Sequence, residues 1–279
     1  MSVRVIYTDM DGTMVGPGGS FFRSEDGASI LDPARALIEM HDAGIQLVLV
    51  SGRTRPQLIE AASIFGADGF IAELGAIVGW DQGRQSELLR GSMPPEFDAV
   101  PSELIAAITA RYPGRLELHR PWHRNREVDV MLRGAIDVAE ADAWLAEQGF
   151  GWLRLRDNGL ISPEHMPELG IRPHVYHLVP DGVGKGEAVR FDLVRRGFEP
   201  TEAVAIGDSA SDLTMAPFVG RMHLVANAMR HPHIPGLLAD YPNTVVEEGA
   251  VGIGWATAVR AAVAEAPHAP TATEAALAG

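Results

Sequence analysis

Two aspartates stand one residue apart near the start of the chain, in the segment Asp9-Met10-Asp11-Gly12-Thr13. They follow Val3 to Thr8, a short β-prone run that ends abruptly at the first aspartate. Two carboxylates at a strand end can turn to the same side once the chain leaves its extended form, and Gly12 makes that turn easy. Because Asp-x-Asp alone also fits an ordinary polar turn, the pair needs support from elsewhere in the sequence.

Three further segments carry groups that bind phosphate or metal ions. They are Val50-Ser51-Gly52-Arg53, Gly184-Lys185-Gly186 and Gly207-Asp208-Ser209-Ala210-Ser211-Asp212. A hydroxyl and free N–H groups at a helix start can cradle a phosphate, and a lysine can neutralise a phosphoryl oxygen. Two aspartates four residues apart face the same way on a helix. Taken singly, the three segments also fit a helix cap, a solvated lysine and acids placed by the helix dipole.

The elements predicted around these segments bring all four together. Apolar strands alternate with helices near both ends of the chain, which predicts right-handed βαβ units and a doubly wound parallel sheet of the α/β class. We expect helices over 33–43, 55–65, 185–196 and 211–218, and strands over 46–50, 69–72, 203–206 and 222–225. Ligands bind beyond the carboxyl ends of such strands. Carboxylates that converge there would repel one another without a cation, and oxygen ligands favour Mg²⁺.

The pattern changes between residues 85 and 173. There we expect a helix, two strands, a second helix and two more strands, over 102–111, 116–119, 128–132, 138–148, 152–156 and 160–162. This αββαββ order indicates an inserted α+β domain over 85–173, within a core domain made of 1–84 and 174–264. Residues 265–279 are rich in Ala, Pro and Thr without an amphipathic period, which predicts a flexible tail.

Composition excludes several classes of function. The net charge is −14, so general binding to nucleic acid is not expected, and the absence of cysteine excludes thiolate chemistry. The first apolar stretch is short and interrupted by aspartates, which is unlike a secretory signal or a membrane span. We therefore expect a cytoplasmic protein whose partner is a small molecule, with no membrane contact; the sequence does not indicate its oligomeric state.

In order, spacing and strand position, the four segments resemble motifs I to IV of the haloacid dehalogenase (HAD) superfamily. The insert lies between the second and third motifs, as in the C2 cap class, and its αββαββ order resembles the type IIB caps of Cof-like and sucrose-phosphatase-like members. Two positions depart from the pattern. Ser211 stands where many relatives carry Asn, and Leu74 interrupts a Glu-Asn-Gly-type segment at Glu73 to Ala76.

The resemblance implies a Rossmann-like HAD core and a Mg²⁺-dependent phosphatase that acts through an aspartyl phosphate. It assigns Asp9 as the nucleophile and Asp11 as the general acid and base. Asp208 would ligate Mg²⁺ together with Asp9 and the carbonyl of Asp11. Asp212 would support the ion or ligate it directly.

The same resemblance assigns the groups that surround the phosphate. Thr13 would orient the loop that carries the general acid. Ser51 and the backbone of Gly52 would bind the transferring phosphoryl group, with Arg53 beside them as a substrate-binding residue. Lys185 would neutralise the phosphoryl group.

A cationic loop in the insert suggests how the rest of a substrate is held. His119 to Arg126 contains three arginines, two histidines and Trp122, although the protein as a whole is acidic. A solvated hairpin tip would have a similar composition. Closed over the core as a lid, the loop would place Arg124 and Arg126 against a leaving group, and a Trp face suits a sugar ring. A sugar phosphate, or a sugar conjugated to an acid, is the substrate that this composition favours.

Two other functions use similar groups. A phosphomutase would need the same core residues and differ only in the acceptor of the phosphoryl group. A response-regulator receiver, which is a signalling switch, also combines an acidic pocket, a phosphorylated aspartate and a lysine. The second aspartate of Asp-x-Asp and the large insert argue against a receiver, since it needs neither.

Overall fold

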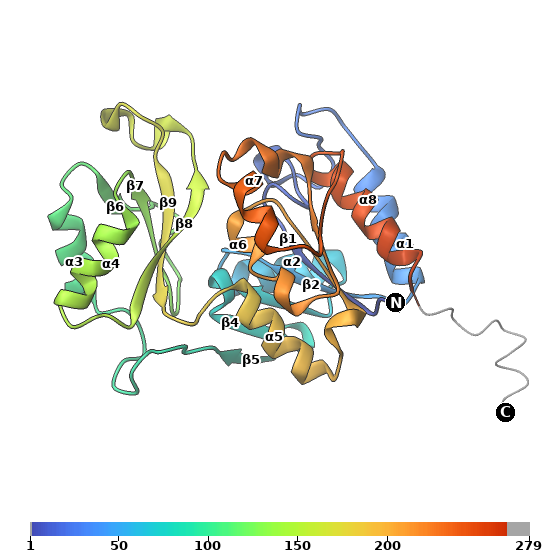
Figure 1. Cartoon of the computed structure of the whole chain (residues 1–279), viewed down its shortest axis with the longest axis horizontal. Coiled ribbons are helices and arrows are strands. Elements are labelled where there is room, and N and C mark those ends of the chain that lie inside the picture. Colours follow the sequence, from blue (N-terminus) through green and yellow to red (C-terminus); the bar gives the residue numbers. More distant parts are fainter. Residues whose placement is uncertain (1, 267–279) are drawn as a thin grey trace, which may run out of the picture.

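Two sheets organise the chain in the computed structural model, which describes residues 2–266 (Figure 1). The larger sheet has the strand order β12-β11-β10-β1-β2-β3-β4-β5, and the smaller has the order β6-β7-β9-β8. The larger sheet is mostly parallel, and the smaller is antiparallel. The prediction of an α/β core with a separate α+β insertion is confirmed.

The central strand of the larger sheet is β1 (Val5–Asp9), which lies between β2 (Gln46–Val50) and β10 (Ala203–Gly207) and is parallel to both. All five residues of β1 are buried, as expected for a strand covered on both faces. The other strands are β3 (Gly69–Ala72), β4 (Ile77–Trp80), β5 (Gln85–Leu88), β11 (Arg221–Leu224) and β12 (Thr244–Val246). Of these, β4 and β5 run antiparallel to their neighbours.

Helices cover both faces of this sheet. One face carries α1 (Asp32–Asp42), α2 (Arg55–Phe65) and α8 (Val251–Val263), and Figure 1 shows α1 and α8 side by side. The other face carries α5 (Lys185–Arg196), α6 (Ala210–Leu213) and α7 (Ile234–Leu237). The buried indole of Trp255 donates from Nε1 to Thr8 Oγ1 at 2.9 Å, which ties α8 to the central strand.

The smaller sheet has a core of its own. Its elements are α3 (Ser102–Arg111), β6 (Leu116–Leu118), β7 (Val130–Gly134), α4 (Val138–Glu147), β8 (Leu153–Leu160) and β9 (His174–Pro180). Apolar side chains of both helices and of the sheet form one buried cluster, which includes Ile108, Leu132 and Leu145. The helices lie on the side of this sheet that faces away from the larger one (Figure 1). The opposite face of the sheet is therefore turned toward the larger sheet.

Several elements differ from the sequence-based expectation. Residues 85–88 pair with β4 in the larger sheet, and residues 174–180 form the fourth strand of the smaller sheet, so each sheet gains a strand from across the predicted domain boundary. No separate strand forms over 160–162, because β8 continues to Leu160. The helix expected over 211–218 ends after Leu213, and a 3₁₀ turn follows at Ala216–Phe218, where Pro217 lacks an N–H donor.

The predicted tail is only partly within the described residues. Glu265 pairs with Arg221, and its carbonyl accepts a hydrogen bond from the N–H of Val3 at 2.9 Å. Residues 267–279 lie outside the description. Between residues 2 and 266, no helix combines the length and the apolar character needed to cross a membrane.

Candidate active site

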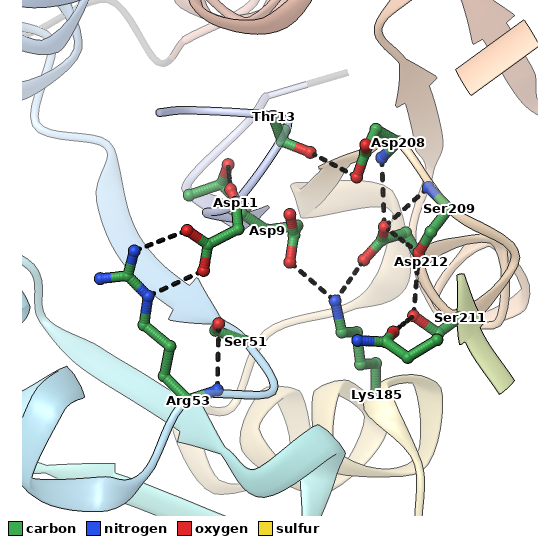
Figure 2. Close-up of polar contacts among 12 residues, drawn as sticks. Asp9, Asp11, Thr13, Ser51, Arg53, Lys185, Asp208, Ser209, Ser211 and Asp212 are labelled. Atoms are coloured by element: carbon green, nitrogen blue, oxygen red, sulfur yellow. Dashed lines mark hydrogen bonds and ion pairs between the residues drawn. The ribbon is translucent and has the colours of Figure 1, made fainter. Parts of the chain in front are cut away.

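The four predicted segments meet at the carboxyl ends of β1, β2 and β10 (Figure 2). Asp9 is the last residue of β1, Ser51 follows β2 and Asp208 follows β10. Lys185 is the first residue of α5, and its side chain reaches from this helix toward Asp9 and Asp212 (Figure 2). The parallel pairing of the three strands explains the meeting, because it brings their carboxyl ends to one edge.

A buried ion pair joins Asp9 to Lys185. The lysine donates from Nζ to Asp9 Oδ1 at 2.8 Å and to Asp212 Oδ1 at 2.7 Å, and all three residues are at most 5% exposed. Burial alone would lower the pKa of Lys185, but the two carboxylates outweigh it and raise that pKa, so the ammonium group stays charged. The other oxygen of Asp9, Oδ2, is buried and has no hydrogen-bond partner among the described residues.

Asp212 uses both of its oxygens within the protein. Oδ1 accepts from Lys185, and Oδ2 accepts from the backbone N–H groups of Asp208 and Ser209 and from Ser209 Oγ at 2.6 Å. These bonds fold the loop after β10 around the carboxylate. Asp212 thus supports the loop after β10, and its predicted role at the ion, as support or as a direct ligand, remains a prediction.

Three carboxylates are crowded closely enough to hold a cation. Asp9, Asp208 and Asp212 each offer an oxygen within 4.8 Å of the others. Burial raises the pKa of Asp9 to about 7; the positive charge of Lys185 opposes this rise, and the negative charge of Asp212 adds to it. Burial and the charge of Asp9 raise the pKa of Asp208 well above its usual value. A cation would relieve this crowding, and an all-oxygen donor set with an unpartnered oxygen on Asp9 fits Mg²⁺.

Two neutral residues hold Asp208 in place. Thr13 donates to Oδ1 at 3.2 Å, and Asn227 donates from Nδ2 both to Oδ2 at 3.1 Å and to the carbonyl of Gly12 at 2.9 Å. Gly12 is needed here, because its φ is +87° and a Cβ atom would lie 2.5 Å from Asp208 Oδ2. Thr13 thus bonds the carboxylate of Asp208 in addition to being part of the loop that carries Asp11. Sequence reasoning missed Asn227, since no local pattern marks it.

Asp11 points away from Asp9 and toward Arg53 (Figure 2). Arg53 donates to both carboxylate oxygens, from Nε at 2.8 Å and from Nη2 at 2.6 Å, and the side chain of Asp11 is 54% exposed. Ser51 is buried, and its Oγ accepts from the N–H of Arg53 at 3.2 Å. The predicted general acid therefore lies two residues from the predicted nucleophile in the chain, but its carboxylate is held by an arginine that follows β2.

The chain is similar to known phosphatases in sequence and in fold. No family model matches the chain. A phosphoglycolate phosphatase of Methanoculleus marisnigri is 28% identical over 261 residues, covering 92% of this chain and 96% of that protein. The sucrose-phosphatase of Synechocystis, solved with sucrose and phosphate, has a TM-score of 0.63 at 17% identity and covers 95% of this chain and 98% of its own. A haloacid dehalogenase-like hydrolase from Bacteroides thetaiotaomicron has a TM-score of 0.59 at 16% identity, with coverages of 93% and 99%.

This is the haloacid dehalogenase fold. The predicted resemblance is confirmed, and the two relatives named as phosphatases fall in the predicted class of enzyme, the hydrolases of phosphoric monoesters. In this fold the larger sheet is the HAD core, and the smaller sheet with its two helices is the cap.

The cap contacts the HAD core beside the predicted phosphoryl-binding loop. Arg126 donates from Nη2 to the carbonyl of Gly52 at 2.9 Å, and from Nη1 to both oxygens of Asp129 at 2.7 and 2.9 Å. On the core side, the buried carboxylate of Glu73 accepts from the backbone N–H groups of Glu127, Val128 and Asp129 at 2.9–3.1 Å. The segment 126–129 is thus fixed at both ends to the core loops after β2 and β3.

The two arginines predicted for substrate binding lie in different environments. The side chain of Arg126 is 5% exposed and spans cap and core. Arg124 is exposed, and no hydrogen bond or ion pair joins its side chain to another described residue. Another contact between cap and core comes from β8, where Asn158 Oδ1 accepts from Ser211 Oγ at 3.4 Å. Ser211, the residue that departs from the family pattern, therefore faces the cap.

Proposed function

We propose that this chain is a magnesium-dependent phosphatase that hydrolyses a small phosphorylated metabolite through a phosphorylated Asp9. One observation carries the proposal. In the buried carboxylate of Asp9, Oδ1 accepts a hydrogen bond from Lys185, whereas Oδ2 has no partner among the described residues. A carboxylate in this state can form a bond to phosphorus while the adjacent ammonium offsets the charge of the phosphoryl group. The phosphatase names of the relatives support the same reaction.

Asp9 and Asp11 would carry out the two steps of the reaction. An oxygen of Asp9 would bond to phosphorus as the bond to the leaving oxygen breaks, and Asp11 would give that oxygen a proton. In the second step water would attack phosphorus, Asp11 would take its proton and Asp9 would be released. Asp11 has to leave Arg53 to do this, and the incoming phosphoryl group, itself an anion, would compete for that guanidinium group.

The ion and the loop after β2 would complete the site. Mg²⁺, held by Asp9, Asp208 and the carbonyl of Asp11, would offset negative charge on the transferring phosphoryl group. The hydroxyl of Ser51 and the N–H of Gly52 would bind its oxygens. The cap, which reaches this loop through Arg126, would exclude water and hold the leaving group.

A panel of phosphorylated sugars and phosphorylated acids, assayed with Mg²⁺ for released phosphate, tests the proposal. Asp9→Asn should abolish release without changing the unfolding transition, and Asp42→Asn, at an exposed position at the end of α1, should leave release unchanged. EDTA should abolish activity, and added Mg²⁺ should restore it. Near-normal turnover by Asp9→Asn, or full activity in EDTA, would contradict the proposal. An isomeric ester in place of free phosphate would indicate a phosphomutase.

A further inference from the structure

An irregular part of the cap strand β8 lies against the core. The pairing of β8 with β9 shifts register between Asp157 and Leu160, so that two residues of β8, Asn158 and Gly159, stand opposite the single residue Val175. Such a bulge interrupts the regular alternation of side chains and redirects one of them. In this bulge the redirected side chain is that of Asn158, which contacts the core.

Contacts within the cap hold the bulge in this shape. Asp157 Oδ1 accepts from the backbone N–H of Gly159 at 2.9 Å, and the same carboxylate pairs with Nδ1 of His174 at 2.8 Å. Gly159 has a φ of +96°, a conformation that residues with a Cβ atom rarely adopt. The backbone on both sides of Asn158 is therefore fixed, and its side chain is held toward the core.

Asn158 touches two of the loops that form the candidate active site. Its Nδ2 would lie 3.7 Å from a Cβ atom added to Gly52, which follows β2, and its Oδ1 lies 3.4 Å from Ser211 Oγ, which follows β10. In the sheet β1 lies between β2 and β10, and Asp9 is the last residue of β1. A side chain that reaches both flanking loops lies across the end of β1, over the predicted nucleophile.

The amide of Asn158 is only weakly engaged within the protein. Ser211 has a single hydroxyl hydrogen, and Ser209 Oγ, at 2.9 Å, is a closer acceptor for it than Asn158, because Ser209 gives its own hydrogen to Asp212 at 2.6 Å. No hydrogen bond joins Nδ2 of Asn158 to another described residue. Solvent reaches this place, since Asn158 is only partly buried and the side chain of Asp11 is half-exposed. A ligand can therefore reach the amide.

The type of donor matches what the neighbouring core position lacks. Ser211 stands where many members of the superfamily carry Asn, so the core has no amide there. Asn158 brings an amide to the same position from the cap. Its Nδ2 offers two N–H donors without a charge, and N–H donors bind anionic oxygens strongly. This suits a phosphoryl group whose charge Lys185 already offsets.

We propose that Asn158 is a phosphoryl-binding residue contributed by the cap, and that its Nδ2 donates to an oxygen of the transferring phosphoryl group. The amide takes the place of one that the core lacks at Ser211, so the phosphoryl site is complete only when the cap is seated on the core. Asp157 and Gly159 act through Asn158 as positioning residues. This inference rests on the proposed phosphatase activity and adds a residue to its site.

Every substrate shares the phosphoryl group, so loss of the amide should affect all substrates alike. Asn158→Ala should lower kcat/KM roughly 10- to 100-fold both for p-nitrophenyl phosphate and for the best ester of the panel, the range for one hydrogen bond to a charged group. The inhibition constant of inorganic phosphate should rise by a similar factor. Asn158→Asp keeps the shape of the side chain but repels an anion, so it should lose more.

Returning the amide to the core provides the decisive comparison. In the Asn158→Ala background, Ser211→Asn should recover most of the lost kcat/KM, because an amide again lies beside the phosphoryl group and the two changes nearly exchange their volumes. Asn125→Gly is the control, because Asn125 is an exposed asparagine of the cap with a φ of +60°, which glycine also adopts. It should behave as wild type. Urea denaturation should show that each variant is folded.

The outcomes separate this inference from the proposal on which it rests. No phosphate release from any compound by the wild-type protein would overturn both. With an active wild type, the assignment of Asn158 alone would be overturned by wild-type kinetics in Asn158→Ala, by a loss confined to the panel ester, or by no recovery when Ser211→Asn is added. A loss confined to the panel ester would place Asn158 on the leaving group. A failed recovery would mean that Asn158 only holds the cap to the core.

Discussion

Glu73 links the predicted phosphoryl-binding loop to the cap, so its replacement should weaken both the fold and the site. Its own N–H donates to the carbonyl of Arg53, and the next N–H, that of Leu74, donates to the carbonyl of Ser51. Its carboxylate accepts from three N–H groups of the cap segment 127–129. This one turn therefore holds the core loop through its backbone and the cap through its side chain.

The expected loss follows from the hydrogen bonds. Glu73→Ala removes the acceptor of three N–H groups, two of which belong to the buried residues Val128 and Asp129. At about 1–3 kcal/mol for each stranded buried donor, the free energy of unfolding should fall by about 2–6 kcal/mol. Glu73→Gln keeps an oxygen for those two donors but turns an amide N–H toward Glu127, which should cost about 1–2 kcal/mol.

Urea denaturation of the three proteins provides the measurement. Glu60→Gln, on the exposed side of α2, is the control and should remain within about 0.5 kcal/mol of wild type. A Glu73→Ala variant as stable as wild type, with the same m-value, would refute the role assigned to these hydrogen bonds.

The pH dependence provides a second check. Burial and the charge of Asp129 raise the pKa of Glu73 to about 7, so the folded protein holds a proton there more tightly than the unfolded chain does. The stability that this proton contributes is complete below about pH 4.5, the usual value for Glu, and declines as the pH rises through about 7. The deficit of Glu73→Gln relative to wild type should therefore shrink between pH 5 and pH 8. A deficit that grows would show that the three N–H donors keep the carboxylate ionised.

Two further predictions concern the predicted general acid and the two arginines of the cap loop. Asp11→Asn should lower turnover of an alkyl phosphate roughly 10²–10⁴-fold while metal binding, followed by calorimetry, is retained; an unchanged rate would contradict the acid and base role. Arg126→Ala should impair both a natural substrate and p-nitrophenyl phosphate, because Arg126 bonds the carbonyl of Gly52 and orients Asp129. Arg124 is exposed, so Arg124→Ala should leave the activity on both substrates unchanged. A raised KM for the natural substrate in Arg124→Ala would show that Arg124 binds substrate after all.

Local signals predicted much of the HAD core. The bounds expected for β2, α2, β3 and α5 are those observed, because each apolar or amphipathic run is closed by a glycine, a proline or a polar turn. The acidic segments could also be recognised directly, since their carboxylates stand at the ends of strands. Right-handed βαβ connection then requires these ends to share one edge of the sheet, which the structure shows.

Other features depended on which distant segments pair. An apolar run predicts a buried strand but does not indicate which sheet the strand joins. Residues 174–180 could therefore not be assigned to the cap until their pairing with β7 and β8 was known. The antiparallel strands β4 and β5 and the helix α8 were not predicted for a similar reason, since packing onto existing elements stabilises them.

The polar contacts that complete the site join residues far apart in the chain. Asn227 reaches the carbonyl of Gly12 across 215 positions, and Arg126 reaches that of Gly52 across 74. Neither residue has a sequence neighbour that marks its partner. The sequence by itself determined the type of core and the kinds of group at its strand ends, because periodicity, turns and strand-end carboxylates are local properties. Only the tertiary structure decided that Arg53 holds Asp11, that Asp212 supports a loop and that Arg126 bonds the predicted phosphoryl-binding loop, because these contacts follow from how folded segments approach one another.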